Sequence, residues 1–278
     1  MKRILMFVTG ILSCAMLSAP SAPAEEMTLF VMNVGKADCM LLRSGKSAYL
    51  IDTGRGNSFE VVESALASLG VSRLDGVIIT HTDSDHVGGL KKLLKTNIQI
   101  DHLYTSYFYL PEKENKENPV LKAADKQDIT VSYLMSGDSL PLDGGTLDVI
   151  GPLRAATDKE DNNSLVLFVQ AAGGSILLAG DMEFPEESDL LSAGVIPSAD
   201  ILKVANHADG DATSEALMNM VQPQVAIIST STKEKPDTPS PRVLRLLKKW
   251  NAEIWQTQEA DTGILVTVRD GDISVISQ

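Results

Sequence analysis

Short apolar runs bounded by glycine, serine and aspartate turns recur from residue 27 to the end of the chain, and their length is typical of β-strands. In the first half, the predicted strands are Met27 to Asn33, Cys39 to Arg43, Ala48 to Asp52 and Leu74 to Thr80, followed by short strands between Ile129 and Val149. In the second half, they are Ser164 to Gln170, Ser175 to Ala179, Ile201 to Val204, Val225 to Ser229, Glu253 to Gln256, Ile264 to Val268 and Ile273 to Ile276.

Stretches with apolar residues at helical spacing lie between these strands. The predicted helices are Phe59 to Leu69, Val87 to Lys95, Ser214 to Val221 and Arg242 to Trp250. The charged, proline-containing stretch Leu110 to Gln127 is predicted as an insertion with a helical piece near Val120 to Ala124, either overhanging a site or forming a solvated connection. The pattern shows no domain boundary, so residues 25–278 are predicted to form one α/β domain.

The first 24 residues differ in composition from the rest. Lys2 and Arg3 precede the apolar stretch Ile4 to Leu17, and small residues follow at Ala22-Pro23-Ala24. This pattern predicts a signal peptide cleaved after that triplet, and hence an exported protein, periplasmic or extracellular. A membrane anchor is disfavoured because the apolar run is short and interrupted. A lipoprotein signal ending at Cys14 is the alternative.

The composition is acidic, with 24 lysine and arginine residues against 37 aspartate and glutamate residues and a net charge of −13. Such a surface repels polyanions unless metals or a local basic patch compensate, which counts against tight nucleic-acid binding. The alternative is that the acidity keeps an exported protein soluble. Cys39 is the only cysteine outside the predicted signal peptide, so no internal disulfide is expected. Neither a further membrane span nor a protein partner is predicted.

The densest group of reactive side chains directly follows the apolar run Val77-Ile78-Ile79. Within six residues the chain carries His81, Asp83, Asp85 and His86. A mixed nitrogen and oxygen set of this kind suits zinc, manganese or iron. A polar surface loop is the alternative, but four such residues behind a buried strand favour a metal site.

These residues resemble the His-x-His-x-Asp-His signature of the metallo-β-lactamase superfamily, in the His-x-Asp-x-Asp-His form of the hydrolase domain of ComEC-type competence proteins. Further matches follow in family order: Asn33-Val34-Gly35-Lys36-Ala37-Asp38, Leu50-Ile51-Asp52-Thr53-Gly54, Asn162-Asn163-Ser164-Leu165-Val166-Leu167, Leu177-Leu178-Ala179-Gly180-Asp181 and Leu202-Lys203-Val204-Ala205-Asn206-His207. The resemblance covers about residues 28–268. It implies a four-layer αββα sandwich and a hydrolase that uses one or two divalent metal ions, zinc or manganese.

The resemblance also implies a ligand set with two metal positions. The first position would use Asp85, His86, Asp181 and His207. The second would use His81, Asp83 and the shared Asp181. A further histidine that is usual in the family is replaced near Asn163, and the resulting oxygen-rich set shifts the preference from zinc towards manganese.

Two departures from the ComEC-type pattern bear on activity. Asn206-His207 stands where those domains usually have a histidine pair, and Thr238-Pro239-Ser240-Pro241 stands where they have a His-Pro motif. The second departure removes a side chain that could serve as an acid or contact a phosphate. Asp38 and Asp52 are predicted either to orient ligands or water or to stabilise strand-end turns. His102 is predicted to be a structural or surface residue.

A bound cation makes hydroxide available near neutral pH and polarises the group under attack. Asp85 is the predicted residue for orienting the nucleophile, and Asp181 would bridge two metals. The resemblance suggests a phosphodiester substrate, in nucleic acid or a nucleotide. An ester, lactone or β-lactam remains an alternative because fold does not fix reaction. A non-catalytic metal-binding protein with a weakened site is the second class of function.

Overall fold

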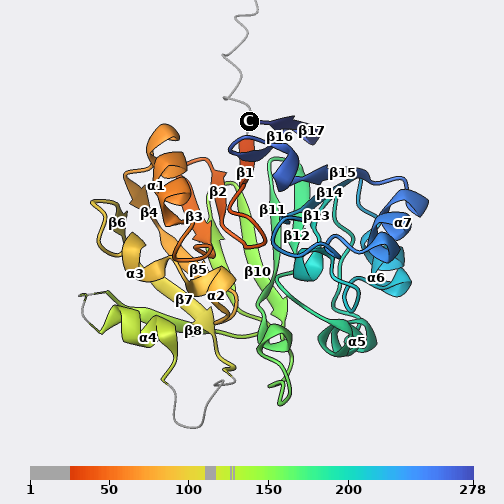
Figure 1. Ribbon diagram of the computed structural model, residues 1–278, viewed down its shortest axis with the longest axis horizontal. Helices are drawn as coiled ribbons and strands as arrows, with labels where there is room; N and C mark the ends of the chain where they lie inside the picture. Colours follow the sequence, from red (N-terminus) through yellow and green to blue (C-terminus); the bar gives the residue numbers. More distant parts are fainter. Residues whose placement is uncertain (1–25, 110–116, 126, 128) are drawn as a thin grey trace, which may run out of the picture.

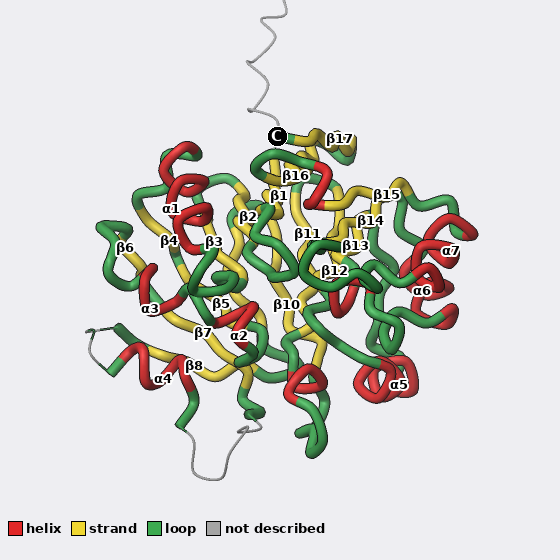
Figure 2. The backbone as a smooth tube through the Cα atoms, viewed as in Figure 1, coloured by secondary structure: helices red, strands yellow, loops and turns green. Residues whose placement is uncertain are grey.

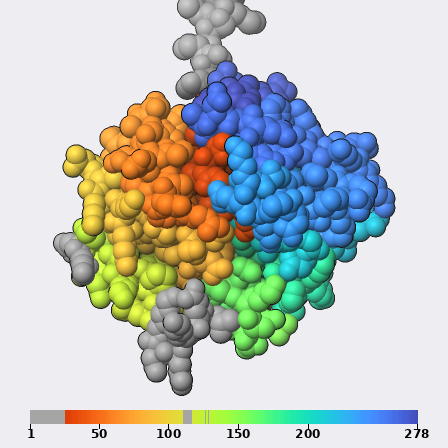
Figure 3. All heavy atoms as spheres, in the orientation of Figure 1, coloured from red at the N-terminus to blue at the C-terminus, as the bar shows by residue number. Residues whose placement is uncertain are grey.

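The computed structural model describes residues 26–109, 117–125, 127 and 129–278. Two β-sheets stack face to face, and helices cover the outer face of each (Figures 1 and 2). This is the predicted four-layer αββα sandwich. The space-filling view shows the first third of the described chain, in orange and yellow, on one side and the last third, in blue, on the other (Figure 3).

The first sheet has eight strands in the order β17-β16-β1-β2-β3-β5-β7-β8. Their bounds are β1 Glu26–Met32, β2 Met40–Ser44, β3 Ser47–Ile51, β5 Gly76–Ile79, β7 Leu103–Ser106, β8 Val131–Leu134, β16 Gly263–Arg269 and β17 Asp272–Ser277. A separate short pair joins β4 (Arg73–Leu74) to β6 (Gln99–Ile100). From β3 to β8 the neighbouring strands are parallel, so their carboxyl ends lie at one edge.

The second sheet has seven strands in the order β15-β14-β13-β12-β11-β10-β9. Their bounds are β9 Ser139–Leu142, β10 Gly145–Gly151, β11 Val166–Ala171, β12 Gly174–Leu178, β13 Ile201–Lys203, β14 Val225–Ile228 and β15 Glu253–Gln256. From β12 to β15 the pairing is parallel, which gives this sheet a matching edge of carboxyl ends.

The core divides into three layers because each strand points alternate side chains to opposite faces. Leu29 and Val31 of the first sheet meet Leu167 and Val169 of the second in the central layer. On the outer faces, apolar helix residues pack against residues of the strands and loops. The bounds of the helices are α1 Phe59–Ser68, α2 Ser84–Val87, α3 Leu90–Leu93 and α4 Pro119–Ala124 beside the first sheet, and α5 Phe184–Ala193, α6 Glu215–Val221 and α7 Pro241–Lys249 beside the second. Three short 3₁₀ helices are η1 Glu160–Asn163, η2 Ala205–Ala208 and η3 Thr257–Glu259.

The predicted strands and helices are present, with two corrections to their bounds. The strand predicted over Leu74 to Thr80 is divided, because β4 pairs elsewhere and β5 begins at Gly76. The helix predicted over Val87 to Lys95 is replaced by α2 and α3. Gly89 donates its backbone N–H to the Gly54 carbonyl at 2.9 Å, which interrupts the helical hydrogen-bond ladder. A Cβ on Gly89 would lie 2.2 Å from the Thr53 carbonyl oxygen, so glycine is required for this approach.

Other predictions have different outcomes. The helical piece near Val120 to Ala124 is confirmed as α4. The helix α5 is not among the predicted elements. The predicted signal peptide and Cys14 lie outside the described residues. Among the described helices, the longest have 10 residues, well short of the length needed to cross a bilayer. Cys39 is a buried free thiol, and burial raises its pKa well above the usual range.

A buried carboxyl on α5 predicts how stability depends on pH. Glu186 is 3% exposed, and neither of its carboxyl oxygens has a hydrogen-bond partner. Burial, helped by Asp189, raises the pKa of Glu186 well above its usual value of 4.5. Because the folded-state pKa is the higher one, this group's contribution to stability is complete below about pH 4.5 and is lost as pH rises towards the folded-state pKa.

We therefore expect Glu186→Gln to be more stable than the native chain above about pH 5, by about 1.4 kcal/mol for each pH unit until the folded-state pKa is reached. Urea unfolding near pH 5 and near pH 8 measures the difference, with the exposed Glu215→Gln on α6 as the control. Parallel pH dependences for Glu186→Gln and the native chain would contradict the expectation.

Candidate metal centre

The candidate site lies where strand ends from both sheets meet. β5 leads into His81, and α2 carries Asp85 and His86. In the second sheet, β12 is followed by Asp181 and β13 by His207. The parallel strands place these residues at neighbouring carboxyl ends, the usual location of sites in such sheets. The donor atoms gather in overlapping groups that include His81, His86 and Asp181; Asp85, His86 and His207; and His81, Asp83 and Asp161.

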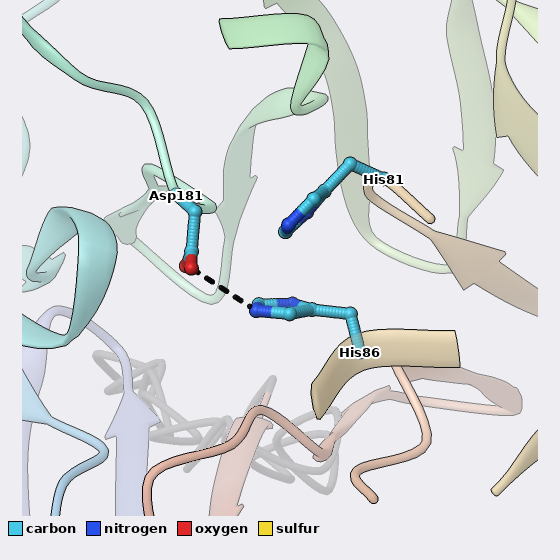
Figure 4. Close-up of side chains that lie close together, drawn as sticks. All are labelled: His81, His86 and Asp181. Carbon is cyan, nitrogen blue, oxygen red and sulfur yellow. Dashed lines mark ion pairs between the residues drawn. The ribbon is translucent and has the colours of Figure 1, made fainter. Parts of the chain in front are cut away.

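Asp181 lies at the centre of the three imidazoles. Its Oδ2 atom is 3.2 Å from Nε2 of His86 and 3.2 Å from Nε2 of His207. His81 and His86 also point their rings towards it (Figure 4). The Nε2 atoms of His81, His86 and His207 and the Oδ1 atom of Asp181 are buried and have no hydrogen-bond partner. Since buried polar atoms are normally paired, this convergence fits a cation between them.

The opposite nitrogen of each ring is held by a neighbour. Nδ1 of His86 lies 2.8 Å from Oδ2 of Asp52, which also accepts a hydrogen bond from the Thr80 hydroxyl. Nδ1 of His207 lies 2.8 Å from the carbonyl oxygen of Ser229. These contacts fix the ring so that Nε2 faces the centre, as metal-binding histidines require. Asp52 also has a positive φ of 58°, so it both contacts a site histidine and forms a strand-end turn.

Behind His207 lies a fully buried ion pair. Asp38 accepts a hydrogen bond from the Ser229 hydroxyl and pairs with Lys203 Nζ at 2.8 Å. All four side chains are buried. Burial would raise the pKa of Asp38, but Lys203 and His207 lower it to about 2. Asp38 therefore remains a carboxylate that supports the His207 side of the site.

Charge distribution within the site favours a cation. Burial would raise the pKa of Asp181, but His207 and His86 hold it well below the usual range. Burial would lower the pKa of His86, but Asp181 and Asp52 hold this pKa well above the usual value of 6.5. The pKa of His81 is lowered by burial and by His86. Asp181 is thus anionic and His81 neutral near pH 7, the forms that bind metal, whereas His86 would release its proton when a metal binds.

Asp85 lies between the clustered histidines and two basic side chains. Its Oδ2 atom is 3.1 Å from Nη2 of Arg55 and 3.4 Å from Nζ of Lys36. Burial would raise the pKa of Asp85, but His86 and Lys36 lower it. The side chain is therefore a carboxylate with cationic groups on its outer side.

Asp161 belongs to the same cluster and was not predicted. Its Oδ1 atom lies 3.7 Å from Nε2 of His81. Burial raises the pKa of Asp161 to about 8, with further contributions from Asp181 and Asp83. The only signal in the sequence is an acidic residue two positions before Asn163, in a stretch without apolar periodicity.

A cavity of about 260 Å³ opens over the cluster, and every residue that lines it is polar or charged. Its floor includes Asp85 and Asp181, and lysines reach it from three separate segments as Lys36, Lys159 and Lys235. Seven of the lining residues are acidic, so the lining suits metal ions, and the three lysines offer contacts to an anionic group beside them.

Of the remaining predicted positions, the structure leaves His102, Asn163 and Thr238 outside the cluster and brings Asn206 to the cavity. The half-buried His102 lies 2.8 Å from the Ser132 hydroxyl, as a structural residue would. Asn163 is buried, and its side chain accepts a hydrogen bond from Ala156 and donates one to Glu160. Thr238 is also buried. Asn206 lines the cavity next to His207.

A family model described as the metallo-beta-lactamase superfamily matches residues 32–232, which include every residue of the candidate centre. The chain belongs to the metallo-beta-lactamase superfamily. Proteins of this superfamily are metallo-hydrolases, so the chain is a metal-dependent hydrolase whose fold implies divalent metal ions.

The relatives of this superfamily member agree with the ComEC-type resemblance. The chain is 27% identical over 281 residues to ComE operon protein 3 of Bacillus subtilis (strain 168), covering 92% of the chain and 35% of that relative. It therefore spans about a third of the relative's length. It is 29% identical over 174 residues to ribonuclease Z of Mycobacterium bovis (strain BCG / Pasteur 1173P2), covering 55% of the chain and 59% of the relative. Among solved structures, the metallo-beta-lactamase fold protein YhfI of Bacillus subtilis shares the fold with a TM-score of 0.59 at 13% identity, covering 87% of the chain and 99% of YhfI.

Proposed function

We propose that the chain is an exported hydrolase that cleaves a phosphodiester, in a nucleotide or a nucleic acid, at the centre around Asp181. The observation that carries this proposal is the convergence of a carboxylate and buried imidazole nitrogens without a hydrogen-bond partner in a wholly polar cavity that lysines reach. The leader-like composition of residues 1–24 supports export.

The proposed ligands form two positions that share one carboxylate. Asp85, His86, Asp181 and His207 would hold one ion. His81 and Asp83, together with Asp181, which belongs to another donor group that contains His81, would hold another. The first set has two nitrogen ligands and suits zinc or manganese, whereas the second is richer in oxygen and favours manganese.

A divalent cation supplies Lewis acidity there, so that water becomes a nucleophile near neutral pH and the phosphoryl group is polarised. The chain's own residues then position the reactants. Asp85 would accept a hydrogen bond from the attacking water and orient it, because Lys36 and Arg55 keep it a carboxylate. Water would add to phosphorus while the bond from phosphorus to the leaving oxygen breaks, and the proton that the water loses would pass to the leaving oxygen, which yields a phosphomonoester and an alcohol.

The lysines favour a phosphodiester over a neutral substrate. In an otherwise acidic chain, Lys36, Lys159 and Lys235 line the cavity, where each is ion-paired with a carboxylate that a phosphate oxygen would replace. The similarity to ribonuclease Z supports the same class of bond. An ester, a lactone or a β-lactam lacks the anionic phosphate that these side chains would recognise.

Hydrolysis of bis-p-nitrophenyl phosphate and of p-nitrophenyl acetate, each with added zinc or manganese, tests the proposal. We expect metal-dependent cleavage of the phosphodiester, lost after chelation and in His207→Ala. His102→Ala is the matched control, since this histidine lies outside the cluster. Cleavage of the carboxylic ester alone would overturn the phosphodiester assignment, and metal binding without cleavage of either compound would favour the non-catalytic alternative.

A further inference from the structure

A third carboxylate faces the second metal position from a separate segment. The donor atoms of His81, Asp83 and Asp161 all lie within 4.8 Å of one another. Asp161 comes from η1, which precedes β11, whereas the other two residues follow β5. Two segments that are distant in sequence therefore bring their donor atoms together at one point.

His81 provides independent evidence of a ligand at this point. Its ring is fully buried, and its Nε2 atom has no hydrogen-bond partner. Nδ1 is held from behind by the hydroxyls of Ser164 at 3.1 Å and Thr80 at 3.2 Å. The free nitrogen is thus directed to the side where Asp161 lies, 3.7 Å away, which is too far for a hydrogen bond.

Hydrogen bonds fix η1 against the loop that carries Asp83. The Glu160 carboxylate accepts hydrogen bonds from the hydroxyl of Thr82 at 2.7 Å and from its backbone N–H at 3.2 Å. Thr82 lies between the two ligands of this loop, and Glu160 directly precedes Asp161. The contact therefore sets the distance between Asp161 and the His81 side of the site.

Asn163 does not fill this position. Its amide holds the backbone of Ala156 at 2.8 Å and the Glu160 carboxylate at 3.0 Å, so both ends of the side chain are engaged within its own segment.

We propose that Asp161 is a ligand of the second metal position and completes it together with His81, Asp83 and Asp181. This inference rests on the proposed metal centre. With one nitrogen and three carboxylates, the position prefers a hard ion such as manganese over zinc, whereas the His86 and His207 position accepts either. The two positions therefore differ in metal preference within one site.

Manganese binding to the metal-free, mature chain tests the role of Asp161 without reference to turnover. Equilibrium dialysis gives the number of ions bound, and electron paramagnetic resonance distinguishes a coupled pair of manganese ions from an isolated ion. We expect two ions and a coupled signal in the native chain. Asp161→Asn should bind one ion with an isolated signal, and Asp161→His should regain the second ion with zinc in preference to manganese.

Asp158→Asn is the matched control, because it removes one carboxylate from the same segment at an exposed position. It should behave as the native chain does. The inference would be overturned if Asp161→Asn bound two manganese ions or if the native chain bound only one. In both cases the proposed hydrolase function would stand. A native chain that binds no ion would overturn both proposals.

Discussion

Replacing Asp181 with alanine should remove metal from both positions and lower kcat/KM for a phosphodiester by at least about 10³-fold, because a bound cation contributes several kcal/mol to the transition state. Asp181 is the carboxylate that lies 3.2 Å from both His86 and His207, and its donor group includes His81 as well. No other carboxylate in the described cluster is shared in this way by all three rings. Metal analysis of the purified variant, followed by steady-state kinetics with saturating manganese, measures both effects.

Asp189→Ala is the control for loss of an acidic residue, since Asp189 forms a partly exposed ion pair with Arg154 and does not line the cavity. It should retain metal and activity. An Asp181→Ala variant that kept both ions and most of its kcat/KM would rule out the shared role of this carboxylate.

Replacing Lys203 with methionine should lower the free energy of unfolding by about 3–5 kcal/mol, because it leaves Asp38 as a buried charge without its partner. Lys203 is fully buried at the end of β13, where its ammonium group contacts Asp38 at 2.8 Å and the Val204 carbonyl at 3.1 Å. Urea unfolding of the chelator-treated protein measures the loss without a contribution from metal.

The double variant with Asp38→Asn should recover part of the lost stability, since it removes the unpaired charge. Lys248→Met, at an exposed position of α7, should change stability little. A Lys203→Met variant as stable as the native chain would show that the pair is not needed in the folded state.

The sequence predicts the part of the site that lies at strand ends. The apolar run of β5 stops at Thr80, so the side chains that follow it must lie at the edge of the sheet. The same reasoning places Asp181 after β12 and His207 after β13. Parallel pairing then brings these ends together, which is why six predicted ligands lie in one cluster.

The sequence does not predict contacts that depend on how loops pack. Asp161 reaches the site only because Glu160 is held by Thr82, a contact 78 residues apart in the chain. The sequence does not predict the burial of Lys203 either, because a lysine at a strand end usually reaches solvent. The helix α5 was missed although Pro185 and Gly194 mark its two ends, because its weakly apolar sequence gives little periodic signal.

The two groups of ligands come from opposite halves of the chain. His81, Asp83, Asp85 and His86 follow a strand of the first sheet, and Asp181 and His207 follow strands of the second. Bound ions would therefore act as a cross-link across the seam between the sheets, in the way that a disulfide joins distant segments, in a chain whose described part contains only one cysteine. Ion binding adds to the free energy of unfolding by mass action, by about 4 kcal/mol when the free ion is a thousandfold above its dissociation constant. The stability of the contact between the two halves would thus depend on the free-metal concentration in the compartment in which the protein works.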